Sequence, residues 1–346
     1  MVQKTVKVAV SAGGSGAPIL VEALLLAADK LGIGIFVDVI CSPCDYGGGT
    51  KDIRRRFGIG PFADPAKNAL ALSEHPDRDA IRRWLTSRAD LDIFPEQQRR
   101  SGERHRGQSH LNVHFTGATM MTGSHEAALR EFERQLRVRR GRVHLASWDP
   151  DIHVDALLKN GQLIWGEAAI DHRSSHRGVP IEKIQLRPEA PLPSPAVIEA
   201  IKDADLVIWS FGDIWSSLGP IWLVPGLTRA ARVNCGQLLV FANLMTKTDE
   251  TDGWGAAQLV TMAEQFVDRK ADIVVMDTKL GDLDPQVLSR YAAEGAAPVA
   301  VDIPVGQWED RTVFGGDWHN LDEAGALRHD LHKIAGLLQT ILGNLQ

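Results

Sequence analysis

The stretch Asp205-Leu-Val-Ile-Trp-Ser-Phe-Gly-Asp-Ile-Trp-Ser-Ser-Leu-Gly-Pro220 decides the fold class of this chain. Residues 205–210 form an apolar run typical of a buried strand. A polar turn with a glycine follows, and an apolar helical pattern over 220–232 begins at Pro220, which suits the first turn of a helix. A strand, a glycine-containing turn and a helix in this order are typical of open α/β sheets, which bind ligands at the carboxyl ends of their strands.

The turn over residues 212–217 has the features of an anion site. Backbone N–H groups and the positive end of a helix dipole attract phosphate where a strand passes through such a turn into a helix. Ser216 and Ser217 are candidate helix caps or hydrogen-bond donors to a phosphate. Trp215 lies at the turn itself, where its ring either stacks on a ligand or belongs to the core.

A second polar loop follows the next predicted strand, 238–242. Asn243-Leu-Met-Thr-Lys-Thr-Asp-Glu-Thr-Asp-Gly253 is dense in hydroxyl, carboxylate and amide groups, which packing alone does not require. The alternative is a solvated connection with an Asp-Gly turn. Because a similar loop lies about thirty residues upstream at a strand end, we interpret both as walls of one ligand site.

Two further candidate ligand loops lie near the N-terminus. A strand over 5–10 leads into Ser11-Ala-Gly-Gly-Ser-Gly-Ala-Pro18 and a helix over 19–31, which is a nucleotide-binding opening without a P-loop lysine or Gly-x-Gly-x-x-Gly spacing. A strand over 35–40 leads into Cys41-Ser-Pro-Cys-Asp-Tyr-Gly-Gly-Gly-Thr50. Its glycines permit close backbone approach and Asp45 is a candidate Mg²⁺ ligand, although a plain turn is the alternative. The two cysteines are also a candidate redox pair.

Alternating patterns along the chain predict a single domain over 1–346. We expect a Rossmann-like three-layer αβα fold with a mostly parallel sheet. Asn160-Gly161 predicts an inserted β-hairpin over 152–170, and the polar segment 95–118 is expected to be mobile or to form a lid. The other predicted elements are helices over 64–88, 124–140, 195–202, 255–268, 285–294 and 323–343, and strands over 273–276 and 298–301.

Composition excludes several classes of protein. The chain of 346 residues is 44% hydrophobic and 24% charged, as globular proteins are. No apolar run approaches the roughly 20 residues that span a bilayer, and residues 1–9 lack a signal-peptide core, so we expect a cytoplasmic protein without membrane partners. Residues 51–142 hold nineteen Lys and Arg against twelve Asp and Glu, but no nucleic-acid-binding module accompanies them. A homodimer is compatible with the predicted apolar helices.

The order of these motifs resembles the 2-phospho-L-lactate transferase (CofD) superfamily, which also contains the gluconeogenesis-factor (YvcK) proteins. Residues 205–226 are similar to the family segment in which a strand, a Gly/Ser turn and a helix end near Val-Pro-Gly. Thr248-Asp-Glu-Thr-Asp-Gly253, with Asn243-Leu-Met-Thr246 before it, resembles the Gly-Glu-Thr-Asp-Gly loop of the gluconeogenesis-factor branch. Further similar elements are Gly13-Gly14, Asp45 with Gly47-Gly48, Gly107-Gln-Ser-His-Leu-Asn112, and Arg328-His-Asp330 with Lys333.

The resemblance implies roles for these residues. Gly13, Gly14 and Ser15, with Gly212, Ser216 and Ser217, would hold the phosphates of a nucleotide. Asp45 would bind Mg²⁺ or orient an acceptor, and Asp45 and Asp213 are the candidate catalytic residues. The remaining candidate ligand-lining residues are Gly47, Gly48, Asn68, Ser109, Asn112, Trp215, Asn243, Thr246, Asp249 and Asp252.

The sequence combines features of both branches. Where the gluconeogenesis-factor turn reads Gly-Pro-Gly-Ser-x-Tyr-Thr-Ser, this chain has Ser210-Phe-Gly-Asp-Ile-Trp-Ser-Ser217, so that Asp213 replaces a hydroxyl residue. The run Ser217-Leu-Gly-Pro-Ile221 is closer to the Ser-Ile-Gly-Pro-Ile of the transferase branch. Against that branch, Asp45 is followed by Tyr46 rather than by a second acid.

Two functions follow from the resemblance. The first is a transferase that moves a phosphorylated small acid from a nucleoside-diphosphate-activated donor to an acceptor hydroxyl of the deazaflavin type, using Mg²⁺. That chemistry needs positioning and charge neutralisation. The second is a regulator of carbon flux or the cell envelope that binds a UDP-sugar or dinucleotide without chemistry. The expected ligand in either case is a nucleotide-linked small molecule carrying a guanine or uridine nucleotide, or NAD. A nicotinamide-dependent oxidoreductase is a third, weaker alternative, because the fingerprint spacing is absent.

Overall fold

The computed structural model describes residues 5–14, 16–89, 97–98, 104–105, 107–172 and 178–345. Its centre is an eight-stranded sheet of order β14-β15-β13-β12-β11-β1-β2-β7, in which β14 is antiparallel and the other neighbouring strands run parallel. The bounds are β1 Thr5–Ala12, β2 Gly34–Cys41, β7 Gly141–Leu145, β11 Leu206–Trp209, β12 Gln237–Phe241, β13 Ile273–Asp277, β14 Gly306–Trp308 and β15 Arg311–Gly316.

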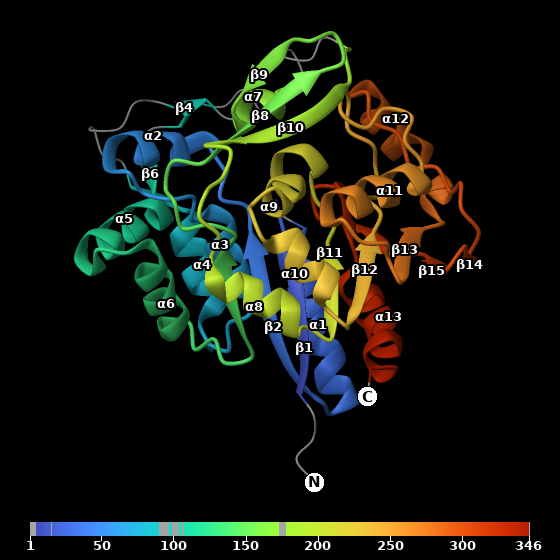
Figure 1. The fold of residues 1–346 in the computed structure, drawn as a ribbon, viewed down its shortest axis with the longest axis horizontal. Helices are drawn as coiled ribbons and strands as arrows, with labels where there is room; N and C mark the ends of the chain where they lie inside the picture. The colour runs from blue at the N-terminus through green and yellow to red at the C-terminus, as the bar shows by residue number, and fades with distance from the viewer. Residues whose placement is uncertain are drawn as a thin grey trace.

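Helices cover both faces of this sheet, as Figure 1 shows. One core packs under α1 (Ala17–Leu31), α3 (Ala63–Ala71) and α13 (Leu331–Gly343), and a second core packs under α8 (Pro195–Asp203), α10 (Leu227–Val233) and α11 (Ala256–Val267). The predicted three-layer αβα architecture is therefore confirmed. The chain order places β1 and β11 side by side in the middle of the sheet, and this reversal of strand order is where open α/β sheets leave a ligand crevice.

A small antiparallel sheet lies beyond the carboxyl edge of the main sheet (Figure 1). Its hairpin pairs β8 (His153–Leu158) with β9 (Leu163–Trp165) through a turn in which Gly161 has φ +84°. Sequence analysis anticipated this hairpin but not the third strand, β10 (Ile181–Arg187), which pairs with β8. The helical turn α7 (Glu167–Ile170) follows β9 and leads toward Asp171.

The helical region before β7 differs in detail from the prediction. The pattern over 64–88 forms two helices, α3 and α4 (Arg78–Thr86), because Pro76 stands in the break between them. The helix predicted over 124–140 ends earlier, as α6 (His125–Gln135), and β7 was missed. The remaining elements here are α2 (Gly48–Phe57), β3 (Arg88–Ala89), β4 (Gln97–Gln98), β5 (Arg104–His105), β6 (Gln108–Ser109) and α5 (His110–Thr122).

Two predictions in the C-terminal third were wrong. Residues 298–301 form no strand but only isolated bridges, from Pro298 to Met245 and from Ala300 to Gly255, and β15 takes the predicted place in the sheet. The terminal helix begins at Leu331 rather than at 323, because β16 (His319–Leu321) and β17 (Leu327–His329) form a hairpin whose turn includes Gly325 at φ +72°. The other elements are η2 (Ile214–Leu218), α9 (Gly219–Trp222), η3 (Leu280–Asp282) and α12 (Pro285–Ala293).

Of the predicted lid, 95–118, most residues before Gly107 lie outside the described residues. The last part of the segment forms β6 and the first turns of α5. That prediction stays untested. Among the described residues, no helix combines the length and the apolar character needed to cross a membrane.

Candidate functional site

A cavity opens where the loops after β1, β2, β11 and β12 meet at the carboxyl edge of the sheet. It has a larger chamber of about 950 Å³ and a smaller chamber of about 370 Å³. The two chambers share Gly14, Ile19, Asp213 and Lys247, and therefore lie next to each other. The predicted site residues that line one chamber or both are Gly13, Gly14, Asp45, Gly47, Ser109, Asn112, Gly212, Asp213, Ser216, Ser217 and Asn243.

The two glycine-containing turns pack directly against each other. A Cβ atom added to Gly13 would come within 2.5 Å of the Cβ of Ser217, so that this position accepts only glycine. Asn243 fixes the second turn from the other side, since its side chain accepts a hydrogen bond from the Gly212 N–H at 3.2 Å and donates one to the Gly212 carbonyl at 2.9 Å. The loops after three different strands are thus held as one unit.

Several predicted residues lie away from the cavity wall. Trp215 is 2% exposed, packs against Trp254 and Phe266, and donates its indole N–H to the Glu250 carbonyl, so its ring belongs to the core. Asn68 and Thr246 are buried and bond to backbone groups, and the Asp252 carboxylate accepts the backbone N–H of Asp249 within their own loop. Gly48 begins α2, and Ser15 lies outside the described residues.

Carboxylates already accept hydrogen bonds from two of the N–H groups that were expected to bind phosphate, those of Gly14 and Ser216. Asp213 accepts hydrogen bonds from the Trp215 and Ser216 N–H groups at 3.0 and 2.9 Å, and Asp64 accepts one from Gly14 at 3.0 Å. Each turn is therefore capped by a side-chain anion of the chain itself. Because like charges repel, a phosphate can approach these turns only where cations balance the charge of the carboxylates, as Lys247 does for Asp213 and Lys67 for Asp64.

A lysine lies at the junction of the chambers among three carboxylates. The Lys247 ammonium contacts Asp213, and it lies 2.6 Å from Asp171 and 2.6 Å from Glu250. An ammonium group has three N–H donors, so these carboxylates engage all of them. Burial and the neighbouring Asp213 raise the pKa of Glu250 to about 9. Burial would also raise the pKa of Asp213, but Lys247 outweighs it and lowers that pKa to about 2.

Asp45 is the most perturbed acid in the larger chamber. Burial, together with the charge of Asp64, raises the pKa of Asp45 to about 6, although its Oδ1 accepts the Gly47 N–H at 3.1 Å. Lys67 lies 2.8 Å from the Asp64 carboxylate and lines the same wall. A buried carboxyl group with a pKa near neutrality is suited to proton transfer, and a pair of carboxylates suits a hard divalent cation.

Arg54 holds the loop that carries Asp45. Its guanidinium donates to the carbonyls of Pro43, Asp45, Pro150 and Ile152, at 3.4, 2.8, 2.8 and 2.8 Å, and so ties the loop after β2 to the segment before β8.

We expect Arg54→Lys to loosen this loop, because an ammonium group cannot reproduce the planar fork of a guanidinium. The melting temperature should fall by several degrees, and trypsin should cleave the native protein faster near residues 43–51. Arg55→Lys, on the exposed side of the same helix, is the matched control and should leave both unchanged. Equal behaviour of the two variants would contradict the assigned role of Arg54.

The smaller chamber has an aromatic wall. The rings of Phe211 and His329 stack with centroids 3.6 Å apart and planes 13° apart, and Arg328 lies beside them. Burial, reinforced by His319, lowers the pKa of His329 to about 3, so its imidazole is neutral. A flat wall next to a guanidinium is suited to a heteroaromatic base.

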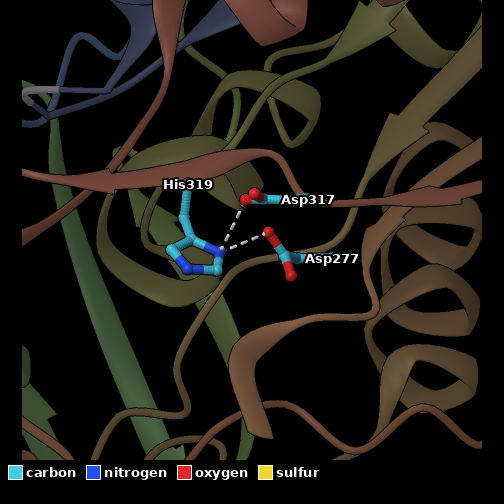
Figure 2. A group of neighbouring side chains, drawn as sticks. All are labelled: Asp277, Asp317 and His319. Carbon is cyan, nitrogen blue, oxygen red and sulfur yellow. Dashed lines mark hydrogen bonds and ion pairs between the residues drawn. The ribbon is translucent and has the colours of Figure 1, made fainter. Parts of the chain in front are cut away.

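A second group of titratable side chains, which includes His319, lies next to His329 of this wall. The Nδ1 atom of His319 lies 2.8 Å from Asp277 and 3.4 Å from Asp317, as Figure 2 shows. His319 is the cross-strand partner of His329, and Lys333 lies 2.7 Å from Asp317. These contacts fix the hairpin β16–β17 against β13 and α13, so we assign the group a structural role.

Sequence reasoning missed several cavity residues. Lys247 and Glu250 lie in the predicted ligand loop 243–253 and line the cavity. The acids predicted from that loop were Asp249 and Asp252, which do not line it. Asp64 and Lys67 lie on α3 and have no motif around them. Glu167 begins the helical turn α7 and Asp171 follows it, and no local pattern indicated that these two residues would line the cavity. Cys41 and Cys44 are free and buried, and burial raises the pKa of the Cys44 thiol to about 12, which disfavours the redox alternative.

Fold and cavity together define a doubly wound α/β protein with a two-chamber site at the switch point of its sheet. The family model of the 2-phospho-L-lactate transferase CofD matches residues 8–317. The chain belongs to the CofD family.

Several similar proteins are named gluconeogenesis factors, the other branch that the motifs resemble. The gluconeogenesis factor of Bacillus subtilis is 26% identical over 341 residues, which cover 97% of this chain and 98% of that protein. A putative gluconeogenesis factor of Thermotoga maritima is also 26% identical, over 97% of this chain and 99% of its own. One from Deinococcus radiodurans is 28% identical over 88% of this chain, which spans 60% of that longer protein. A crystal structure of a UPF0052-family protein from Bacillus halodurans has a TM-score of 0.81 at 24% identity over 96% of this chain and 99% of that one, and so has the same fold.

Proposed function

We propose that this protein is a transferase that moves a phosphorylated small acid from a nucleoside-diphosphate-activated donor to an acceptor hydroxyl. The observation that carries the proposal is the pair of chambers that meet at Gly14, Asp213 and Lys247. A protein that only senses one ligand needs one chamber. Two chambers with a common junction allow two substrates to meet, which is the main requirement of group transfer.

The smaller chamber suits the nucleoside of the donor. The stacked Phe211 and His329 would face the base, and Arg328 would lie near it. The diphosphate would then lie at the junction, next to the capped turns. Since Asp213 and Asp64 already fill those turns, we propose that a divalent cation, expected to be Mg²⁺, binds the carboxylates and the phosphates together.

The larger chamber would receive the acceptor. Asp45, whose pKa is raised to about 6, would accept the proton of the acceptor hydroxyl or bind the cation. The hydroxyl oxygen would form a bond to the phosphorus of the donor, while the bond between that phosphorus and the leaving nucleoside phosphate breaks. Lys247 would balance the negative charge at the junction without binding phosphate directly, because its donors are already engaged.

One observation favours a different function. The curated relatives named above are called gluconeogenesis factors, and the Thr248–Gly253 loop resembles the Gly-Glu-Thr-Asp-Gly loop of that branch. A non-catalytic regulator that binds a UDP-sugar or dinucleotide is therefore the second candidate. It predicts a ligand that binds in the same cavity and is returned unchanged.

The first experiment is native mass spectrometry with GDP, GTP, UDP-N-acetylglucosamine and NAD, each with Mg²⁺ and with EDTA. We expect binding of one nucleotide to weaken at least tenfold in EDTA, because the carboxylate caps then repel its phosphates. A ligand that binds equally well in EDTA would contradict the metal bridge. A bound mass that changes during incubation supports the transferase, and one that stays constant supports the regulator.

A further inference from the structure

The larger chamber carries charge of opposite sign at its two ends. At the inner end, which adjoins the smaller chamber, the carboxylates outnumber the ammonium groups: Asp45, Asp64, Glu167, Asp171 and Asp213 against Lys67 and Lys247. At the outer end, which α4, β3 and β6 form with Glu22 of α1, the cations are Arg82 and Arg88. Among the described residues, none of α4, β3 or β6 lines the smaller chamber. A ligand that fills the larger chamber therefore extends from a negative end to a positive end.

The acids near the arginines of α4 do not cancel their charge. Glu22 lies 3.2 Å from Arg82 and 3.7 Å from Arg78, so one carboxylate serves two guanidinium groups. The other acid beside them, Asp79, lies 3.6 Å from Arg82, but its side chain is 67% exposed and water screens its charge. An anion that enters the chamber can therefore gain energy from Arg82.

Arg88 lies beside polar groups that an anion can share. It is the cross-strand partner of Ser109, so the two side chains are neighbours, and both line the chamber. The Arg88 guanidinium donates to the Gly107 carbonyl at 2.7 Å, which orients the group without neutralising its charge. The Ser109 hydroxyl accepts the Asn112 N–H at 3.3 Å, and a hydroxyl that accepts one hydrogen bond can still donate another. A guanidinium next to a hydroxyl donor suits a phosphate or carboxylate group.

A continuous wall connects this outer end to Asp45. The loop that carries Asp45 runs into Gly49, whose carbonyl accepts a hydrogen bond from the Gln108 side chain at 3.0 Å. A Cβ atom at Gly49 would collide with that side chain, so the loop packs directly on β6, which Figure 1 shows between α2 and α5. Since Asp45 and Arg88 line the same chamber, one elongated ligand can reach both.

The chamber also offers an apolar surface. Leu70 on α3, Leu85 on α4 and Leu111 on α5 line it and are buried. On α4, Leu85 lies three residues after Arg82, so the two side chains share one face of the helix. Next to an apolar wall, the attraction between an anion and a guanidinium is stronger than in water, because the effective dielectric constant is lower.

We propose that the acceptor in the transfer reaction is an amphiphilic anion. Its apolar or aromatic body would pack on the three leucines, its hydroxyl group would reach Asp45, and its phosphate or carboxylate group would bind Arg88 and Ser109. The opposite charges of the two ends orient such a molecule with its hydroxyl group toward the junction. This inference rests on the proposed function, because it names the class of acceptor.

The test compares two fluorescent probes that share an aromatic body and differ in charge. Anilinonaphthalene sulfonate carries one sulfonate group, whereas phenylnaphthylamine is uncharged. We expect the sulfonate to bind the wild-type protein about tenfold more tightly than the uncharged probe. Arg88→Gln should weaken binding of the sulfonate about tenfold and leave phenylnaphthylamine unchanged, and Arg88→Lys, which keeps the charge, should weaken the sulfonate by less than about threefold.

Arg83→Gln is the matched control, because Arg83 is exposed on α4 and lines neither chamber. It should leave both affinities unchanged, which assigns the lost binding to the chamber rather than to apolar side chains elsewhere. Equal affinity of the wild type for the two probes, no binding of either, equal loss of both probes in Arg88→Gln, or equal effects of Arg88→Gln and Arg83→Gln would overturn the proposal. The measurement involves no nucleotide and no turnover. A negative result therefore rejects the anionic acceptor alone, and native mass spectrometry tests the transferase separately.

Discussion

Asp45→Asn should abolish turnover and make the protein more stable at the same time. Loss of a proton acceptor in the transfer step is expected to lower the rate by about 10²- to 10⁴-fold, while nucleotide affinity stays within about tenfold. The measurement is the rate at which product mass forms with the nucleotide identified by mass spectrometry. Full turnover in this variant would remove Asp45 from the mechanism.

The stability gain follows from the pKa of Asp45. Burial raises this pKa from 3.8 to about 6, so the folded state binds a proton more tightly than the unfolded state. The contribution of Asp45 to the stability of the wild type should therefore fall as the pH rises from about 4 to about 6 and then stay level. Asparagine lacks this loss, and its advantage at pH 8 should approach an upper bound of about 3 kcal/mol and vanish near pH 4. Asp79→Asn, at an exposed carboxylate, should show no such pH dependence.

Lys247→Met should have the largest destabilising effect at the chamber junction. It removes the cation from three carboxylates that lie largely out of water, with side-chain exposures of 7%, 16% and 3%. Breaking a fully buried pair costs about 3–5 kcal/mol. Because the lysine side chain is 37% exposed, we expect about 2–3 kcal/mol here.

The effect of Lys247→Met should grow between pH 5 and pH 8. Without the ammonium, burial raises the pKa of Asp213, and the cost rises as the pH increases and Asp213 loses its proton in the folded state. Urea unfolding at both pH values measures this difference. Lys279→Met, which breaks a lysine–acid pair of the same three-residue spacing at the surface, is the control and should change stability by less than about 1 kcal/mol. Adding Asp213→Asn to Lys247→Met should restore part of the loss, and a double variant no more stable than the single one would contradict this account.

The fold was predictable because its signals are local. Each buried strand is a short apolar run, and the turns after β1, β2, β11 and β12 carry glycine and polar residues that identify the ligand edge. The errors arose where local pattern and tertiary context disagree. Residues 298–301 have the composition of a strand, but the place beside β13 is taken by β15, and 319–329 form a hairpin in a region with helical periodicity.

The site was predictable only where a strand end marked it. The position of Asp45 and Asp213 follows from the sheet, but their partners do not. Asp64 lies on a helix nineteen residues beyond Asp45, and Asp171 directly follows the helical turn α7. Within the loop 243–253, the side chains that face the cavity are set by how the loop folds: Asp249 has φ +66° and lies within the loop's own hydrogen bonds, whereas Lys247 points to the junction. The residue composition of the loop predicts neither the position of the Asp249 side chain nor that of the Lys247 side chain.

The carboxylate caps of the two turns also bear on how the protein responds to a ligand. Asp213 and Asp64 give the two turns the hydrogen bonds that a bound anion would otherwise supply, so the shape of these turns does not depend on an anion. At these two turns, the arrival of a ligand should exchange hydrogen-bond partners and leave the backbone of the turns in place. Occupancy would then be visible in the vibrational frequencies of these carboxylates more readily than in the overall dimensions of the molecule.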